Sequence, residues 1–108
     1  MTEYLQIITT TEKKAAAERI ARVLIEGSLA ACVQIVGPIT STYSWKGQIE
    51  TAEEWQCLIK TRADLFSEVE RSIKAIHPYE TPEIIAFPIR EGSQEYLDWM
   101  EEVLHPVT

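Results

Sequence analysis

The feature that most constrains the fold of this chain is an alternation of side chains between Leu29 and Thr61. Apolar residues occupy mainly odd positions on both sides of WKGQI (45–49), and the even positions from 40 to 56 are mostly Thr, Ser, Glu and Gln. A period of two is typical of β-strands, and a glycine between two such runs is a turn signal. The pattern therefore predicts one long β-hairpin.

A three-residue loop, 46–48, would keep the apolar residues of both arms on one face of this hairpin. The register that follows sets Trp45 opposite Ile49, Ile39 opposite Trp55, and Ile35 opposite Ile59. Gly37–Pro38 interrupts the first arm and predicts a bulge or bend. In the same register Cys32 and Cys57 point to opposite faces, so we expect no disulfide between them.

The remaining segments predict two further strands and three helices. Residues 4–10 indicate a buried strand, 12–26 a helix capped by Gly27, 63–76 a second helix, 83–89 a buried strand, and 94–104 a third helix capped by Ser93. The order β-α-β-β-α-β-α is typical of the ferredoxin-like, or split βαβ, sandwich with an additional C-terminal helix. We expect residues 1–108 to form one α+β domain.

The length of the hairpin also predicts an oligomer. Arms of roughly 15 residues at about 3.3 Å each reach about 50 Å, whereas a compact domain of about 100 residues has a radius of gyration of only about 13 Å. The hairpin must therefore bend or project from its domain. Its outer part carries Tyr43, Trp45 and Trp55, large apolar surfaces that a partner subunit would cover. We assign these three residues to the interface of a homo-oligomer.

The charge balance excludes several partners. Seventeen acidic residues against ten basic ones give a net charge of −7, which disfavours nucleic acid and anionic membranes and favours cations. The N-terminal residues lack the basic lead of a signal peptide, and no segment has the ~20 apolar residues of a spanning helix. We expect a cytoplasmic protein.

The segment AIHPYETPEI (75–84) contains the main candidate site. Pro78 should force His77 out of the helical conformation and end the preceding helix. The imidazole of His77 is either a structural hydrogen-bonding group or a metal ligand. Glu80 either joins His77 and Tyr79 in a polar network or lies solvated in a turn.

Cysteine and glutamate side chains supply the other candidate ligands. Cys32 lies in an apolar setting, so it is either a buried structural thiol or a soft-metal ligand, while Cys57 is expected in the core. Glu50, Glu53 and Glu54 form an acidic run on the hairpin. Such runs are usually solvated, although a threefold axis would gather three copies of each carboxylate around a hard cation.

Four segments together resemble the CutA family of divalent-cation tolerance proteins. They are LAACVQIVGPITSTYSWKGQIE (29–50), EEWQCLIKT (53–61), HPYETPEI (77–84) and YLDWM (96–100), and they occur in order through nearly the whole chain. The resemblance implies a ferredoxin-like subunit in a homotrimer similar to the PII signalling proteins, with the hairpin extending across subunits. It also implies a non-enzymatic role in tolerance of copper and other divalent metals.

Only part of the family's metal-binding pattern is present. The resemblance assigns metal binding to a cysteine at the end of the first strand and to two consecutive histidines before the proline. Thr9 and Ile76 stand at the first two of these positions, and only His77 matches. Because copper prefers thiolate and imidazole ligands, these substitutions weaken the expected site. The candidate ligands of a divalent cation such as copper are therefore His77, Cys32 and Glu80.

Three alternative functions remain open. A PII-like sensor of small ligands would use clefts between subunits, although the chain has neither a glycine-rich phosphate loop nor a basic cluster for a nucleotide. A scaffold would hold another protein. An enzyme with Cys32 as nucleophile and His77 as base would need both side chains within hydrogen-bond reach. No third group or motif supports that chemistry, and we do not expect an enzyme.

Overall fold

The computed structural model describes residues 3–106 and confirms the predicted order of elements. The elements are β1 (Tyr4–Thr11), α1 (Lys14–Glu26), β2 (Cys32–Trp45), β3 (Gln48–Arg62), a short 3-10 turn (Ala63–Leu65), α2 (Phe66–Ile76), β4 (Ile85–Ile89) and α3 (Gln94–Val103). Gly27 follows α1 as its C-cap, and the Ser93 hydroxyl accepts a hydrogen bond from the Tyr96 N–H at the start of α3, as predicted.

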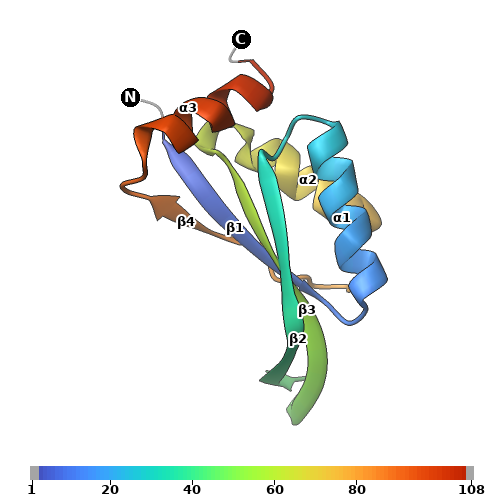
Figure 1. Cartoon of the computed structure of the whole chain (residues 1–108). Coiled ribbons are helices and arrows are strands. Elements are labelled where there is room, and N and C mark those ends of the chain that lie inside the picture. Colours follow the sequence, from blue (N-terminus) through green and yellow to red (C-terminus); the bar gives the residue numbers. More distant parts are fainter. Residues whose placement is uncertain (1–2, 107–108) are drawn as a thin grey trace.

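The four strands form one antiparallel sheet in the order β2-β3-β1-β4. This order is the ferredoxin-like arrangement that the element order predicts. Helices α1 and α2 cover one face of the sheet, and α3 lies across the end at which β1 begins (Figure 1). Within residues 3–106 no helical layer covers the opposite face, so the described sheet has one covered and one open face (Figure 1).

The core lies between the sheet and helices α1 and α2. Apolar side chains of β1 and β3 meet those of the two helices there: Ile7, Ala17, Ile20, Leu24, Ala30, Cys57, Ile59, Val69 and Ile73. A second cluster, in which Met100 and Leu104 contact Ala31 and Leu65, attaches α3 to the end of the sheet. The spacing of apolar residues along each helix therefore corresponds to the face that the helix buries.

The β2–β3 hairpin projects from this body, as its length predicts (Figure 1). The chain measures 44 × 26 × 21 Å along its principal axes, with a radius of gyration of 14.5 Å. Helix α1 covers only the inner part of the hairpin (Figure 1). The hairpin thus has an inner half within the domain and an outer half beyond it.

The predicted register of the hairpin is wrong. Its turn contains only Lys46 and Gly47, whose φ angles are 49° and 79°, and two residues in this left-handed region form the tight turn that matches strand twist. Trp45 therefore pairs with Gln48 instead of Ile49. Further along, Ile39 pairs with Glu54 and Ile35 with Cys57, not with Trp55 and Ile59.

The predicted irregularity at Gly37–Pro38 is confirmed, and it changes which residues share a face. The register shifts between Val36 and Ile39. Before the bulge, Val33 and Ile35 face the helices; after it, the odd positions of β2 turn to the open face. The prediction that the apolar residues of both arms share one face is therefore wrong, because a bulge exchanges the faces of a strand. Tyr43 and Trp45 lie on the face opposite to Trp55.

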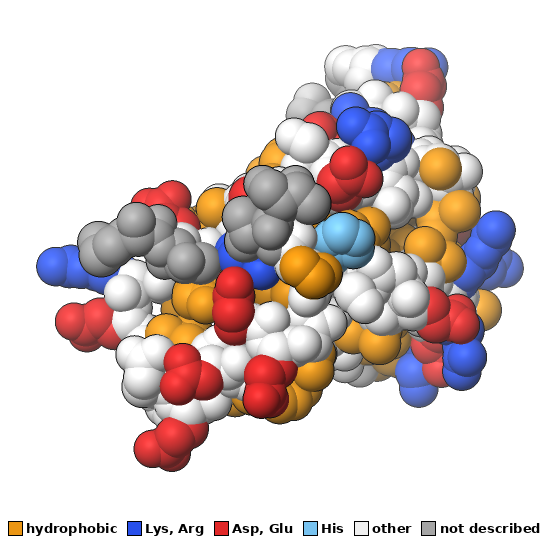
Figure 2. Space-filling view, turned by 90° about the horizontal axis from the view of Figure 1, so that it is seen from above, with side chains coloured by type: hydrophobic (Ala, Val, Ile, Leu, Met, Phe, Trp, Pro, Cys, Tyr) orange, Lys and Arg blue, Asp and Glu red, His pale blue; other side chains and the backbone are white. Residues whose placement is uncertain are grey.

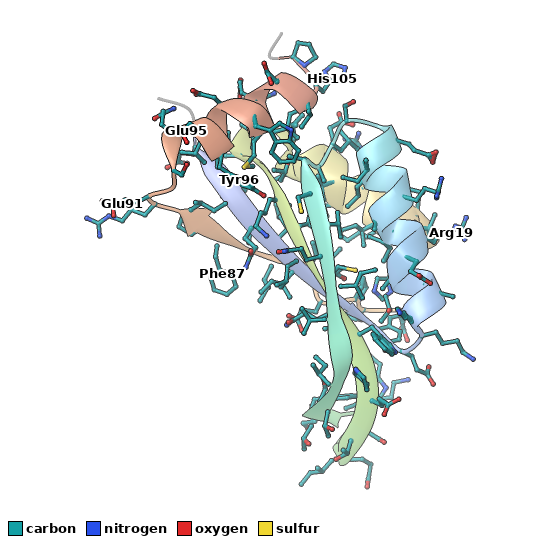
Figure 3. The ribbon with its side chains drawn as sticks, viewed as in Figure 1. Arg19, Phe87, Glu91, Glu95, Tyr96 and His105 are labelled. Carbon is teal, nitrogen blue, oxygen red and sulfur yellow. The ribbon has the colours of Figure 1, made fainter. Side chains whose placement is uncertain are left out.

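Strand β4 is an edge strand and is not buried as predicted. It begins at Ile85, and exposed fractions of 45% at Ile85 and 51% at Phe87 show that its apolar side chains lie on the open face of the sheet. Phe87 points away from the helices (Figure 3). The sequence pattern indicates an apolar strand, but in a single chain nothing covers it.

The two cysteines lie on opposite faces of the sheet, as predicted, although the predicted register itself is wrong. Cys32 pairs with Lys60 and Cys57 with Ile35, so the thiols face opposite sides of the sheet and both are free. Seen from the α3 end, acidic side chains are spread over the surface with basic ones among them (Figure 2). In residues 3–106 no helix is long and apolar enough to cross a membrane.

Candidate functional site

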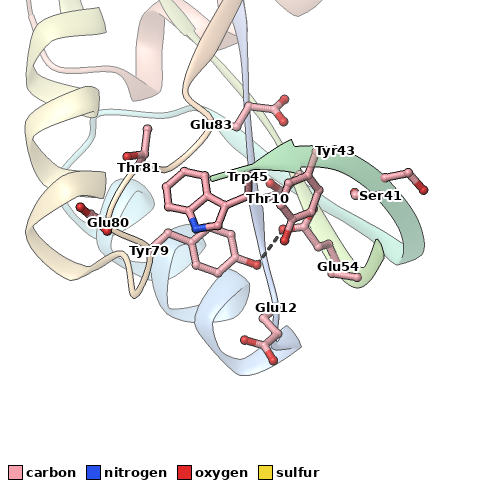
Figure 4. Close-up of a pocket in the computed structure, with 12 residues that line it drawn as sticks. Thr10, Glu12, Ser41, Tyr43, Trp45, Glu54, Tyr79, Glu80, Thr81 and Glu83 are labelled. Carbon is pink, nitrogen blue, oxygen red and sulfur yellow. Dashed lines mark hydrogen bonds between the residues drawn. The ribbon is translucent and has the colours of Figure 1, made fainter. Parts of the chain in front are cut away.

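The segment 77–84 links α2 to β4 and forms one wall of the candidate site. Helix α2 ends at Ile76, and His77 is extended, with φ −73° and ψ 133°. Pro78 is the reason, because its ring excludes the preceding residue from the helical region. The predicted helix end is therefore confirmed. The segment then runs past the outer part of the hairpin before it joins β4 (Figure 4).

His77 uses both ring nitrogens to hold this segment against the sheet. Its Nε2 lies 2.9 Å from the Thr10 carbonyl oxygen, and its Nδ1 accepts from the Tyr79 N–H at 3.1 Å. A carbonyl can only accept, so Nε2 carries the proton of a neutral imidazole. Burial lowers the pKa of His77, while the Thr10 carbonyl and the charge of Glu54 oppose this shift. In this arrangement neither nitrogen offers a lone pair to a metal.

Tyr79 and Glu54 form the polar centre of the site. The Tyr79 hydroxyl donates to Oε2 of Glu54 at 2.7 Å (Figure 4), and Glu54 is only 6% exposed. Burial raises the pKa of Tyr79, and the hydrogen bond to Glu54 raises it further, so the phenol stays protonated. Burial also raises the pKa of Glu83, with a further contribution from the charge of Glu54. The centre is a buried carboxylate with one neutral donor.

These side chains line a pocket of about 680 Å³ between the hairpin and the 77–84 segment. Four glutamates and three aromatic residues dominate its walls, and no Lys, Arg or His of the described part of the chain lines it. The lining residues are Thr10, Glu12, Ser41, Thr42, Tyr43, Trp45, Ala52, Glu54, Tyr79, Glu80, Thr81 and Glu83 (Figure 4). The pocket is therefore strongly acidic, and part of its wall is aromatic.

The sequence placed Glu80 in a network with His77 and Tyr79, but the carboxylate that contacts Tyr79 is Glu54. Within residues 3–106 the Glu80 side chain has no hydrogen bond to either residue, although it lines the pocket. Glu54 appeared in the sequence only as part of an acidic run. Its place in the site depends on the hairpin register, which turns Glu54 toward the pocket and Glu53 away from it.

The two thiols lie outside this pocket. Cys57 is fully buried in the core, as predicted, and burial raises its pKa to about 11. Cys32 is half-buried beside Tyr96 of α3, whose pKa is raised by burial and then by its contact with Cys32. Tyr96 lies at the end of the sheet that α3 covers (Figure 3). An apolar setting of this kind leaves Cys57 unreactive.

Cys32 and His77 are too far apart to act as nucleophile and base within one chain. Cys32 pairs with Lys60, while Thr10, the partner of His77, pairs with Gln56. Four residues along β3 correspond to about 13 Å. Hydrogen-bond reach, which nucleophilic catalysis requires, is about 3 Å. The three candidate ligands His77, Cys32 and Glu80 are therefore not assembled around one point.

The positions that the resemblance links to metal binding are structural here. Thr9 is fully buried, and Ile76 packs against the core cluster. Within residues 3–106 no group of three His, Cys, Asp or Glu side chains is close enough to hold a metal ion. A centre with several protein ligands would need residues from another subunit.

The three predicted interface residues lie in two environments. Tyr43 and Trp45, 44% and 39% exposed, lie beside the pocket on the outer half of the hairpin. Trp55 packs against the core cluster on the other face, with the Lys14 ammonium 5.4 Å from the centre of its ring. The assignment of all three to an interface remains a prediction.

Comparison with known proteins identifies relatives along nearly the whole chain. The family model described as CutA1 divalent ion tolerance protein matches residues 5–103. The divalent-cation tolerance protein CutA of Thermus thermophilus is 44% identical over 96 residues, covering 89% of this chain and 93% of that protein. The Archaeoglobus fulgidus protein of the same name is 50% identical over 88 residues, covering 82% of this chain and 85% of that protein.

Solved structures of such proteins share the fold. The Thermus thermophilus Cut A1 structure superposes with a TM-score of 0.92 at 41% identity, over 94% of this chain and 99% of that one. CutA1 from Oryza sativa gives a TM-score of 0.94 at 37% identity, over 97% and 96% of the two chains.

Proposed function

Because the chain belongs to the CutA1 divalent ion tolerance family, we propose that it is a non-enzymatic, homotrimeric protein that acts in the cytoplasmic response to divalent metal ions, copper in particular. The observation that carries the proposal is the match over residues 5–103, which includes the hairpin, the 77–84 segment and α3. Relatives matched at 44% and 50% identity are named for divalent-cation tolerance.

The open face of the sheet supports assembly into an oligomer. Val36, Ile85 and Phe87 lie on this face with 43–51% of their surfaces exposed. Exposed apolar side chains at both edges of one sheet face are typical of a surface that another subunit covers. A sheet with helices on only one face gains the missing apolar contacts when its open face packs against other copies.

In this proposal divalent cations bind weakly, through carboxylate oxygens. Both nitrogens of His77 are engaged by the backbone, and Cys57 is buried in the core. The net charge of −7 attracts cations, and a trimer multiplies every carboxylate by three. Such sites lack the soft ligands that give copper its highest affinity.

The side chains of the site support a non-enzymatic role. The imidazole of His77 is held neutral by two backbone groups, and the phenol of Tyr79 stays protonated. Catalytic bases are usually tuned to exchange a proton near the working pH. These groups instead hold a loop in place.

The cellular role is tested by deleting the gene in its natural host. We expect the copper concentration that halves the growth rate to fall, and expression of the chain from a plasmid to restore it. An unchanged response to copper and to other divalent ions would contradict the proposed role.

Assembly and cation binding are tested on the purified protein. Sedimentation equilibrium should give a mass three times the 12.3 kDa of one chain. Calorimetric titration with Cu²⁺ should show dissociation constants of about 10 μM or weaker, the same for wild type and Cys32→Ser. A site tighter than about 1 μM that Cys32→Ser removes would show a soft-ligand centre instead.

A further inference from the structure

The inner half of the open sheet face carries a cation that no carboxylate neutralises. Lys60 lies on this face, because Ile59 beside it in β3 is fully buried on the other. Its Nζ donates to Oε1 of Gln34 at 2.5 Å, and its ladder partners are Cys32 and Gln6. Among residues 3–106 it makes no ion pair. The charge of this ammonium therefore has no partner within the described chain.

The outer half of the same face carries the opposite charge. Glu54 is 6% exposed, and its Oε2 accepts a hydrogen bond from the neutral Tyr79 hydroxyl at 2.7 Å. In the described part of the chain Glu54 makes no ion pair. Three further carboxylates, those of Glu12, Glu80 and Glu83, line the same pocket (Figure 4). A buried carboxylate among other carboxylates favours a cationic partner.

A single chain cannot bring these two charges together. Glu54 and Lys60 belong to the same strand and face the same side of the sheet, six residues apart. At about 3.3 Å per residue this separation is about 20 Å. A second copy of the chain, displaced along the strand, can place its own Lys60 beside Glu54.

The apolar surroundings of Lys60 make such a partner necessary once the face is covered. Exposed apolar side chains lie at both edges of this face, Val36 on β2 and Ile85 and Phe87 on β4. When another subunit covers them, the Lys60 ammonium loses water, which is costly unless the charge is paired. A threefold ring repeats one contact in which two different patches meet. The acidic outer half and the basic inner half are complementary patches of this kind.

The other basic residues are less suited to meet Glu54. Six of the ten lie in, or directly before, α1 and α2, which cover the opposite face of the sheet (Figure 1). Arg62 is already enclosed by Asp64 and Glu101. Lys46 lies at the tip of the hairpin, and Arg90 is exposed after β4. Among the described residues, Lys60 is the cation of the inner open face.

We infer that Glu54 of each subunit forms an ion pair with Lys60 of the partner subunit, so that another copy of the chain completes the acidic pocket. The inference rests on the proposed homotrimer and names a contact that closes it. Three such pairs form around the ring, and each neutralises one carboxylate and one ammonium that a single chain leaves without a counter-charge.

The test is a charge exchange. Glu54→Lys or Lys60→Glu alone sets like charges against each other at every contact, whereas the double variant restores opposite charges. Sedimentation equilibrium is measured in guanidinium hydrochloride at a concentration that partly dissociates the wild-type trimer. Each single variant should raise the protein concentration at half-dissociation at least about tenfold, and the double variant should recover most of this loss. A double variant as weak as either single variant would overturn the inference.

A milder pair of substitutions covers the case in which a reversed charge prevents folding. Glu54→Gln retains an acceptor for the Tyr79 hydroxyl, and Lys60→Gln removes the ammonium. Once either charge is absent, removing the other should change the half-dissociation concentration less than about twofold, because the two residues act as a unit. Independent effects that simply multiply would overturn the pairing.

Two exposed residues supply matched controls. Glu53→Lys reverses the charge next to Glu54 at a position that does not line the pocket, and Arg90→Glu reverses a basic residue near the sheet edge. Each should change the half-dissociation concentration less than about threefold. Arg90→Glu should also fail to rescue Glu54→Lys. Rescue by Arg90→Glu in place of Lys60→Glu would overturn the assignment to Lys60.

A crystal structure of the assembled protein reports the contact directly. A Glu54 carboxylate within about 4 Å of the Lys60 ammonium of the partner subunit supports the inference, and any other cation at Glu54 overturns it. Wild-type protein that sediments as a single chain would contradict the proposed homotrimer and this inference with it. A trimer that the charge exchange fails to restore would contradict only the pair.

Discussion

The inner and outer halves of the β2–β3 hairpin have similar alternating sequences but different surroundings. In the inner half, Ile59 and Cys57 are fully buried against α1 and α2. In the outer half, Ile49 is 83% exposed, and Tyr43 and Trp45 line a pocket. The boundary is the bulge at Gly37–Pro38.

The difference shows that alternation defines two faces of a strand without deciding which face is covered. In the inner half the helices cover one face, and burial of apolar area stabilises the pairing. In the outer half one face contributes polar and aromatic side chains to a cavity. The bulge makes this change possible because it exchanges the faces between the two halves.

The largest expected effect tests this contrast directly, with the same substitution in each half. Ile59→Ala should lower the free energy of unfolding by about 3–4 kcal/mol, since it leaves a cavity in the core. Ile49→Ala should change it by less than about 0.5 kcal/mol, because the side chain is largely exposed. Denaturant titrations at equal protein concentration measure both. A large cost at Ile49 would show that the outer half is covered in the assembled protein.

The boundary itself is tested at Gly37. A Cβ atom there would lie 2.6 Å from Cε3 of Trp55, so Gly37→Ala should cost about 2 kcal/mol by overpacking. Trp55 should also move, which the indole N–H resonance detects.

Gly47→Ala is the control, because nothing lies within 4 Å of its added Cβ atom and only its φ of +79° is strained. Its cost should be about 1 kcal/mol, with no change at Trp55. If Gly37→Ala is tolerated at no cost, the packing of Trp55 against the bulge is not what holds the boundary.

A pair of buried threonines in the inner part of the sheet should give effects of opposite sign. The Thr9 hydroxyl is buried and has no partner among residues 3–106, so Thr9→Val should raise the free energy of unfolding by about 1 kcal/mol. The Thr61 hydroxyl donates to the Leu29 carbonyl at 2.6 Å, and Thr61→Val should lower it by about 1 kcal/mol. Thermal melts of both variants measure the difference, and a common sign would contradict the hydrogen-bond assignment.

The smallest expected effect is the pH dependence at His77, near the boundary. Its pKa is below the ordinary value of 6.5 because of burial, so the unfolded chain takes up the proton first. Neutral His77 therefore stabilises the folded chain fully above about pH 6.5, and this contribution to the free energy of unfolding is lost as the pH falls. The melting temperature should therefore decrease between about pH 7.5 and 5.5, above the range in which glutamates ordinarily titrate.

His77→Gln should flatten this dependence, because glutamine has no proton to gain. His105→Gln is the matched control, since His105 is exposed at the end of α3. It should retain the wild-type slope. Identical slopes in all three proteins would show that another group controls stability in this range.

Much of the fold follows from local pattern. Alternation identified β2 and β3, apolar runs identified β1 and β4, and helical spacing identified α1, α2 and α3, while the proline at position 78 predicted the end of α2. The register was missed because it depends on Lys46 adopting a left-handed conformation, which is uncommon for a residue with a side chain. An error of one residue at the turn then moved the predicted partners of Trp45 and Ile39.

The candidate site was predicted only in part. The 77–84 segment was identified from its histidine and prolines, and it does line the pocket. The carboxylate of Glu54 was not connected with it, because the two are 25 residues apart and meet only when the hairpin takes its actual register. The role of His77 required the positions of the Thr10 carbonyl and the Tyr79 N–H, which no pattern in the sequence reports.

The sequence by itself determined the elements, their order and the family, because periodicity and short motifs are properties of neighbouring residues. The tertiary structure decided which face of each strand is covered, which carboxylate meets Tyr79, and that β4 is bare in a single chain. The physical reason is that alternation creates two faces of similar character. Only the packing of helices, the turn conformation and the bulge assign one face to the core and the other to the pocket.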